Sequence, residues 1–255
     1  MWPAPLADGA GQRPPLVAVA HGSRDPRAAA VVEALLEEVR RARPGLPVRS
    51  AYLDHAAPSL GQALAGLGAA VVLPLLLTEA YHSRVDLPSA LNEVRAREPR
   101  LRVRYGATLG PHPLLVGALE RRLAEAGVAP RDPGTAVVLV SAGSSDARAN
   151  AVVARVAGEW ALSGGWWGAV PAYASAASPT PEEAVRLLRE AGAPRVAVAP
   201  YLLAPGLFAD KVRRATLAAG ADVVADVLGP APEVARVLLE RYDAALRAPA
   251  EAAAS

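Results

Sequence analysis

Short apolar segments alternate with longer amphipathic segments along the whole chain. Most apolar segments, such as VVLPLLL at residues 71–77, are continuous, which is typical of strands buried on both faces of a parallel sheet. The pattern predicts strands at residues 16–20, 48–53, 70–77, 101–107, 136–141, 168–174, 195–203 and 222–228. It predicts helices at residues 26–43, 58–67, 85–97, 113–126, 147–162, 181–191, 207–219 and 232–247. Strand–helix alternation of this kind indicates an α/β fold with right-handed crossovers.

The second half of the chain repeats the first. Four segments recur in the same order, and they pair residues 16–32 with 137–153, 51–59 with 172–180, 73–86 with 199–212, and 109–113 with 228–232. One long repeat indicates duplication of a domain rather than a solenoid. The repeat predicts two similar, flavodoxin-like parallel-sheet lobes, one at residues 15–130 and a degenerate copy at 135–247. Residues 1–14 and 248–255 are predicted to be flexible tails.

Composition excludes several classes of protein. The 255 residues are 52% hydrophobic and include no cysteine, which excludes disulfide frameworks, iron–sulfur clusters and cysteine nucleophiles. The net charge is only +2 and no block of Lys and Arg occurs, so we expect no nucleic-acid partner. There is no run of 18 apolar residues and no signal peptide, which predicts a soluble cytoplasmic protein without a membrane partner. Phosphate-loop, dinucleotide and nucleophile-elbow motifs are also missing from the sequence.

All four histidines lie in the first copy of the repeat, and they are His21, His55, His82 and His112. Their counterparts in the second copy are Ala142, Ala176, Phe208 and Ala231. Residues that the fold requires are expected in both copies, whereas residues that the chemistry requires are needed in only one. This difference points to a reactive site in the first lobe.

Two of these histidines are expected to meet. If the first sheet has the strand order 2-1-3-4, His21 and His82 follow neighbouring strands, and ligands bind at this edge of open parallel sheets. Asp54 ends the second strand at the same edge, although it is also placed to cap the helix predicted at 58–67. Two imidazoles and a carboxylate suit Fe²⁺ or Co²⁺. Glu79, near His82, is either a relay carboxylate or a solvated residue of the loop.

The other candidates have plainer interpretations. His55 is interpreted as a surface or loop histidine, and His112 as a residue packed at the start of a helix. Phe208 is predicted to form a wall for a large ring. Trp166 and Trp167, which are consecutive in the sequence, are predicted to pack in the core or between the lobes.

Three segments carry a family resemblance. AHGSRDP at residues 20–26, YLDHAAPSL at 52–60 and PLLLTEAYHSRVDLP at 74–88 resemble the class II tetrapyrrole chelatases, the sirohydrochlorin ferro- and cobaltochelatases. The resemblance implies a two-lobed chelatase fold with the metal inserted between the lobes. It also implies that His21 and His82 bind the metal and abstract protons. The family more often has a glutamate at the position of Asp54, which leaves the carboxylate open between Asp54 and Glu79.

The expected activity is insertion of Fe²⁺ into sirohydrochlorin to give siroheme, with loss of two pyrrole protons. The metal is then a substrate, and no permanent cofactor is expected. The alternatives are cobalt insertion for cobalamin synthesis and a carrier that binds metal or tetrapyrrole without catalysis. Because sirohydrochlorin carries eight carboxylates, contacts are expected from polar residues of the cleft, which are Ser23, Arg24, Glu79 and Arg84, with Arg213 and Arg214 as further candidates. Both lobes lie in one chain, so a monomer can form the cleft.

Overall fold

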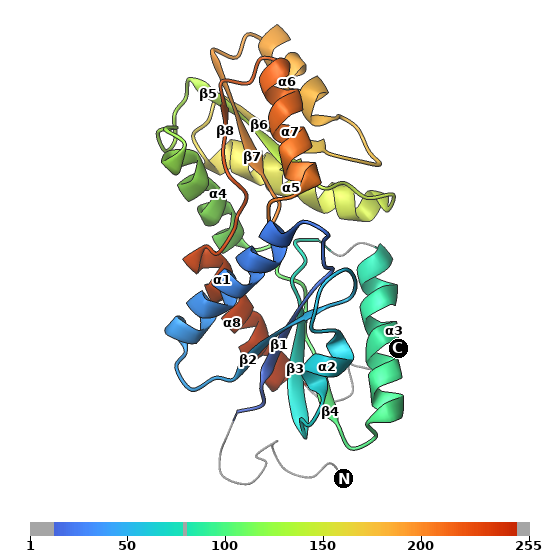
Figure 1. The fold of residues 1–255 in the computed structure, drawn as a ribbon. Coiled ribbons are helices and arrows are strands. Elements are labelled where there is room, and N and C mark those ends of the chain that lie inside the picture. The colour runs from blue at the N-terminus through green and yellow to red at the C-terminus, as the bar shows by residue number, and fades with distance from the viewer. Residues whose placement is uncertain (1–12, 79–80, 249–255) are drawn as a thin grey trace.

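The computed structural model describes residues 13–78 and 81–248, with the side chains of residues 81–85 outside the description. Strands and helices alternate throughout (Figure 1). The strands are β1 (Leu16–Ala20), β2 (Val48–Tyr52), β3 (Ala69–Pro74), β4 (Arg102–Tyr105), β5 (Thr135–Ser141), β6 (Gly168–Tyr173), β7 (Arg195–Pro200) and β8 (Val223–Val224). The helices are α1 (Pro26–Ala42), α2 (Leu60–Leu64), α3 (Tyr81–Arg97), α4 (Pro113–Glu125), α5 (Ala147–Ser163), α6 (Pro181–Glu190), α7 (Leu207–Ala218) and α8 (Pro232–Arg247).

The strands form two parallel sheets with the orders β2-β1-β3-β4 and β6-β5-β7-β8. The strand order predicted for the first sheet is therefore confirmed, and the second sheet repeats it. In each sheet the first strand lies between the next two, so the crossovers diverge at the carboxyl end of β1 and of β5. The two-lobed α/β fold expected from the repeat is the fold observed.

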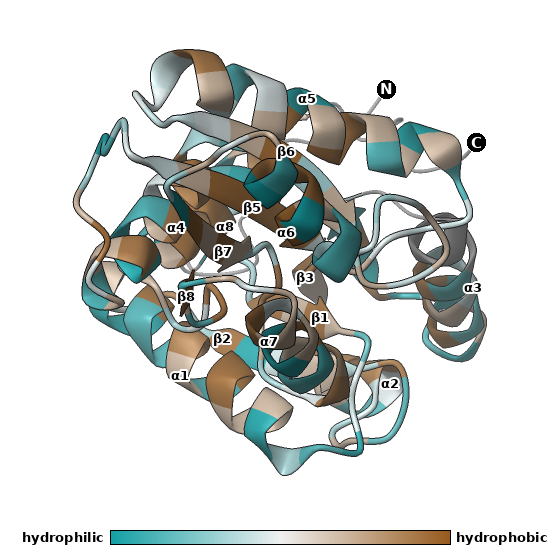
Figure 2. Ribbon diagram, turned by 90° about the horizontal axis from the view of Figure 1, so that it is seen from above, coloured by the Kyte–Doolittle hydropathy of each residue, from teal (hydrophilic) through white to brown (hydrophobic). Residues whose placement is uncertain are grey.

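Each sheet is buried on both faces. Along β1, Leu16 and Ala18 belong to one core cluster, whereas Val17 and Val19 belong to another, as the two-residue period of a strand requires. Figure 2 shows apolar strands enclosed by helices that carry hydrophilic residues. This two-sided burial explains why the strands are continuous apolar runs.

The two lobes exchange their last helices. Helix α4 packs against β7 of the second sheet, whereas α8 packs against α1, β3 and β4 of the first lobe (Figure 1). The largest core cluster consequently contains residues of both lobes, including Leu16 of β1, Val137 of β5 and Trp160 of α5. A boundary near residue 130 thus divides the repeat in the sequence, but it does not divide the packing.

Several element bounds differ from those predicted. Strand β3 ends at Pro74 rather than at residue 77, and β8 has only two residues. Helix α3 begins at Tyr81 rather than at 85 and continues through Pro88, although proline is usually confined to the first turn. The predicted N-terminal tail lies mostly outside the described residues, but Pro14 is buried and its carbonyl accepts a hydrogen bond from the Tyr242 hydroxyl (2.7 Å). No helix of the described residues is both long and apolar enough to span a membrane.

An ion pair fastens α8 to the end of α1. The Arg43 guanidinium donates to both carboxylate oxygens of Asp243 at 2.6 and 2.7 Å, and these bonds hold the pKa of Asp243 below its ordinary value. A lowered folded-state pKa stabilises the protein above the unfolded-state pKa of about 3.9, and this contribution is lost as the pH falls through the folded-state value.

We expect Asp243→Asn to lower the free energy of unfolding by about 0.5–1 kcal/mol at pH 7, because the pair is partly exposed. The gap between variant and wild type is expected to narrow as the pH falls below about 4, where the wild-type carboxylate also loses its charge. Urea denaturation across this pH range measures both effects. A gap that stays constant with pH would show that the charge of Asp243 is not involved.

Candidate functional site between the lobes

His21 follows β1 at the point where the two crossovers of the first sheet diverge. The N–H of Leu75 donates to the carbonyl of Val19 (2.8 Å), and the N–H of Asp54 donates to the carbonyl of His21 (2.9 Å). These bonds continue the sheet register beyond the strands. They hold the segments after β2 and β3 on either side of His21.

The turn after β1 depends on glycine at position 22. Its φ is +96°, and a Cβ there would lie 1.7 Å from the carbonyl oxygen of Asp54. Beyond the turn, the Ser23 hydroxyl accepts from the N–H of Asp25 (3.1 Å), and the Asp25 carboxylate accepts from the N–H of Arg27 (3.0 Å) to cap α1. The close approach and the cap together set the direction in which the site residues leave the sheet.

His82 lies in the first turn of α3, not in a loop before a helix as the predicted bounds had it. Because β1 and β3 are adjacent, His21 and His82 both come from the same edge of the sheet. The side chains of His82 and Arg84, and the whole of Glu79, lie outside the described residues.

The Asp54 carboxylate contacts His55, and Asp54 does not line the cavity beside His21. One carboxylate oxygen accepts from the N–H of His55 (2.8 Å), and the other lies 3.2 Å from His55 Nε2. The backbone of His55 has a φ of +59°, in the left-handed region, and the residue lines the cavity described next. The helix that Asp54 was placed to cap is in fact capped by Ser59. His55 is an exposed loop residue, as the sequence indicated, and it also lines this cavity.

A cavity of about 510 Å³ separates the lobes beside His21, and we call it the central cavity. Its first-lobe side combines polar residues, which include His21, Ser23, Arg24 and His55, with apolar ones such as Val32 and Leu75. Its second-lobe side consists of residues 202–209, which are apolar or glycine, and includes Phe208 as predicted. Phe208 is 50% exposed, although it is a large apolar side chain. A mostly apolar cavity with a few polar side chains on one side is typical of sites that bind small organic ligands.

The second copy of the repeat forms the same turn without an imidazole. Gly143 has a φ of +82°, and a Cβ there would lie 1.9 Å from a carbonyl oxygen. Ala176 has a φ of +57°, close to that of its counterpart His55. Ala142 follows β5 where His21 follows β1. The fold therefore requires the turn, and the imidazoles are additional to it.

His112 and Trp166 have the structural roles that the sequence indicated. His112 caps α4, where its Nδ1 accepts from the N–H of Leu114 (3.2 Å) and its Nε2 lies 3.1 Å from Glu240. Trp166 is buried and meets Trp160 edge to face, with ring centroids 5.9 Å apart. Neither residue lines the central cavity.

The arginines divide between the cavity and its surroundings. Arg24 lines the central cavity, whereas Arg213 and Arg214 do not. Arg213 donates to the carbonyl of Val224 (2.8 Å). The structure adds Arg27, whose guanidinium crosses to the second lobe and binds Asp210 (2.6 Å). No local sequence signal pairs residues so far apart.

Two groups near the central cavity have shifted pKa values: Asp25, which lines it, and Tyr201, which directly precedes its second-lobe wall. Hydrogen bonds from the Arg27 side chain lower the pKa of Asp25, which therefore remains a carboxylate at neutral pH. Burial raises the pKa of Tyr201, whose hydroxyl donates to the carbonyl of Leu77 (3.3 Å) across the lobes. Among the described side chains, no three from His, Cys, Asp and Glu gather closely enough to hold a metal ion.

Comparisons with known proteins agree with this architecture. A model of the CbiX family matches residues 15–126 and 136–245. The sirohydrochlorin ferrochelatase of Priestia megaterium is 28% identical over 201 residues, which cover 76% of this chain and 75% of that protein. The sirohydrochlorin cobaltochelatase of the same organism is 26% identical over 198 residues, covering 74% and 64%. The structure of SirB from Bacillus subtilis with Fe3+ is 24% identical and has a TM-score of 0.81 over 92% of this chain and 96% of that one.

Two parallel-sheet lobes around a shared cavity define a class II chelatase fold, which confirms the resemblance seen in the sequence. The chain belongs to the CbiX family, whose model matches both copies of the repeat.

Proposed function

We propose that this protein is an enzyme that inserts Fe²⁺ into sirohydrochlorin to give siroheme. The observation that carries the proposal is the central cavity, which His21 lines on the first-lobe side and an apolar wall that includes Phe208 lines on the second-lobe side. A tetrapyrrole ring is flat and apolar on its faces, and a metal must reach it from one face only. Membership of the CbiX family and the two chelatase relatives support the same reaction.

The reaction exchanges two pyrrole protons of the free-base ring for one divalent metal ion. An imidazole is neutral for much of the time near pH 7, so it can hold a metal ion or accept a proton. We assign these roles to His21 and His82, which come from neighbouring strand ends. Two protein ligands leave coordination positions open, so the ion can pass to the ring nitrogens.

We assign the remaining proton acceptor to Asp54, acting through His55. Its carboxylate contacts His55, and only the imidazole of that pair lines the central cavity. A carboxylate in this position orients the imidazole of His55 and stabilises the protonated form of that imidazole. Glu79 is the other carboxylate proposed for this step, and it lies outside the described residues.

The carboxylates around the substrate ring need polar partners. We assign this role to Ser23 and Arg24, which line the cavity, and to Arg84 on the first turn of α3. Arginine suits the role because its planar guanidinium binds a carboxylate through two parallel hydrogen bonds.

Cobalt insertion is the second candidate, because a cobaltochelatase is among the relatives. Both ions accept nitrogen and oxygen ligands, so the same site serves either. Iron is placed first because the ferrochelatase relative has the higher identity of the two and is covered over more of its length.

Multiple turnover tests the proposed function. We expect the protein to convert many equivalents of sirohydrochlorin in the presence of Fe²⁺, followed by the absorbance of the metallated ring. A faster rate with Co²⁺ would assign the protein to cobalt insertion. Conversion that stops at one equivalent would instead identify a carrier.

A further inference from the structure

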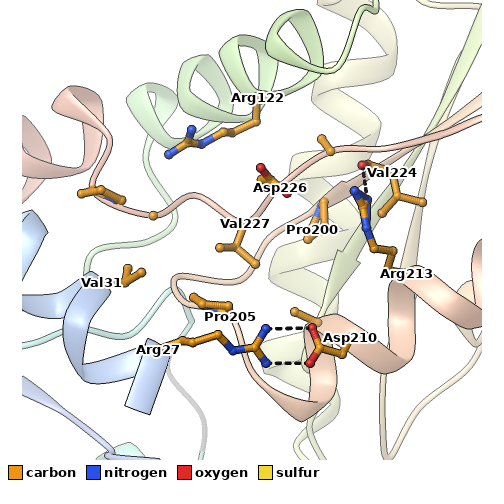
Figure 3. Close-up of a pocket in the computed structure, with 14 residues that line it drawn as sticks. Arg27, Val31, Arg122, Pro200, Pro205, Asp210, Arg213, Val224, Asp226 and Val227 are labelled. Carbon is orange, nitrogen blue, oxygen red and sulfur yellow. Dashed lines mark hydrogen bonds and ion pairs between the residues drawn. The ribbon is translucent and has the colours of Figure 1, made fainter. Parts of the chain in front are cut away.

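A second cavity, of about 450 Å³, lies next to the central cavity, and we call it the side cavity. Figure 3 shows it between α1, α4, α7 and the loop after β8. Three arginines line it, which are Arg27, Arg122 and Arg213, together with Asp210 and Asp226. Two of these arginines are held by backbone carbonyls, because Arg122 donates to Leu228 in the loop and Arg213 to Val224 at the end of β8.

The ion pair between Arg27 and Asp210 lies where the two cavities meet. Pro205 and Ala209 line both cavities, and Asp210 follows Ala209 directly. Arg27 belongs to the first turn of α1 and Asp210 to the first turn of α7, so the pair also joins the lobes. Figure 3 draws its two contacts as dashed lines between the Arg27 guanidinium and the Asp210 carboxylate.

The two carboxylates that bind Arg27 hold it differently. Asp25 caps α1, has a side chain only 16% exposed, and accepts from both Nε and one terminal nitrogen of Arg27. Asp210 is 46% exposed and meets the outer edge of the guanidinium, formed by its two terminal nitrogens. Asp25 therefore fixes the guanidinium, whereas the exposed bond to Asp210 contributes little and is easily exchanged.

We propose that Arg27 exchanges Asp210 for a carboxylate of the tetrapyrrole, so that an acidic arm of the substrate passes from the central cavity into the side cavity. The outer edge of the guanidinium offers two parallel donors, which is the geometry that a carboxylate binds best. Arg213 adds positive charge to the lining of the side cavity, whereas the charge of Arg122 is matched by Glu125 (2.7 Å). Asp210 competes with the substrate for Arg27 and so lowers the affinity of the protein for the substrate. This inference rests on the proposed function, since it takes sirohydrochlorin as the ligand.

The exchange is tested by titrating metal-free sirohydrochlorin into the full-length protein and following the absorbance of the ring. Arg27→Gln removes the donor, and we expect it to raise the Kd about tenfold, a factor that corresponds to about 1.4 kcal/mol. Asp210→Asn removes the competitor, and we expect it to lower the Kd about threefold, because a bond between Arg27 and an exposed carboxylate is weak. Arg27→Lys keeps the positive charge but removes the two parallel donors of the guanidinium, so its Kd is expected to lie between those of Arg27→Gln and the wild type.

The opposite signs separate this proposal from a clasp that merely holds the lobes together. If the pair were only a clasp, both variants would break it and would shift the Kd in the same direction. Arg43 and Asp243 provide the matched control, because they form another arginine–aspartate pair outside both cavities. Arg43→Gln and Asp243→Asn are expected to leave the Kd unchanged.

Three outcomes would be decisive against one or both ideas. Shifts of the same sign, or no shift, for Arg27→Gln and Asp210→Asn would overturn the exchange while leaving the proposed function intact. Tight binding with the expected shifts but without metal insertion would support the exchange and remove the proposed catalysis. A wild-type protein that does not bind sirohydrochlorin would overturn both.

Discussion

His21→Ala is expected to reduce the rate of metal insertion at least about 100-fold, because it removes a group proposed to hold the ion or accept a proton. The residue is exposed at the end of β1, and its own side chain supports no core packing. Circular dichroism and the unfolding midpoint should therefore stay close to those of the wild type. The rate is measured from the absorbance of the metallated ring with the metal in excess.

His112→Ala is the matched control for this variant. It also removes an imidazole from the first lobe, but that imidazole caps α4 and lies outside the central cavity. We expect a loss of about 1 kcal/mol in the free energy of unfolding from the missing cap, with metal insertion retained. If His21→Ala keeps nearly full activity in a folded protein, the assignment of the site is wrong.

Gly22→Ala is expected to destabilise the protein by about 2–4 kcal/mol, since it combines an unfavourable φ with a backbone clash. The added Cβ would meet the carbonyl oxygen of Asp54 at 1.7 Å, and neither backbone can move without breaking the bond between Asp54 and His21. Metal insertion should fall as well, because both residues shift together. Urea denaturation measures the first effect and the absorbance assay the second.

Gly143→Ala separates the two effects, because it places the same clash in the second copy of the turn. We expect a similar loss of stability, since a Cβ there would lie 1.9 Å from the carbonyl oxygen of Ser175. Activity per folded molecule should change less than in Gly22→Ala, because Ala142 stands where the first lobe has His21. Equal losses of activity in both variants would show that the turn acts only through stability.

The duplication allows each feature of the first copy to be compared with its counterpart in the second copy. Asp25 and Asp146 cap corresponding helices, and Ser59 and Thr180 form corresponding capping boxes. These local devices persist in both copies because each helix end needs its hydrogen bonds satisfied. The imidazoles persist in one copy only, which is what a single reactive face between two lobes requires.

The sequence by itself determined the elements, the parallel sheets and the edge where His21 and His82 emerge. These features depend on short-range patterns, such as apolar runs, caps and glycine turns, that act within a few residues. The predicted bounds were less accurate near Pro88, because proline favours the first turn of a helix, whereas the observed helix begins one turn earlier, at Tyr81.

Only the tertiary structure decided how the lobes are joined and what faces the site. The exchange of α4 and α8, the apolar wall that includes Phe208 and the pair between Arg27 and Asp210 all depend on contacts between segments brought together by folding. Such contacts follow from how two whole surfaces fit. The periodicity of apolar residues along a strand or helix does not specify which residues will lie on the opposite surface.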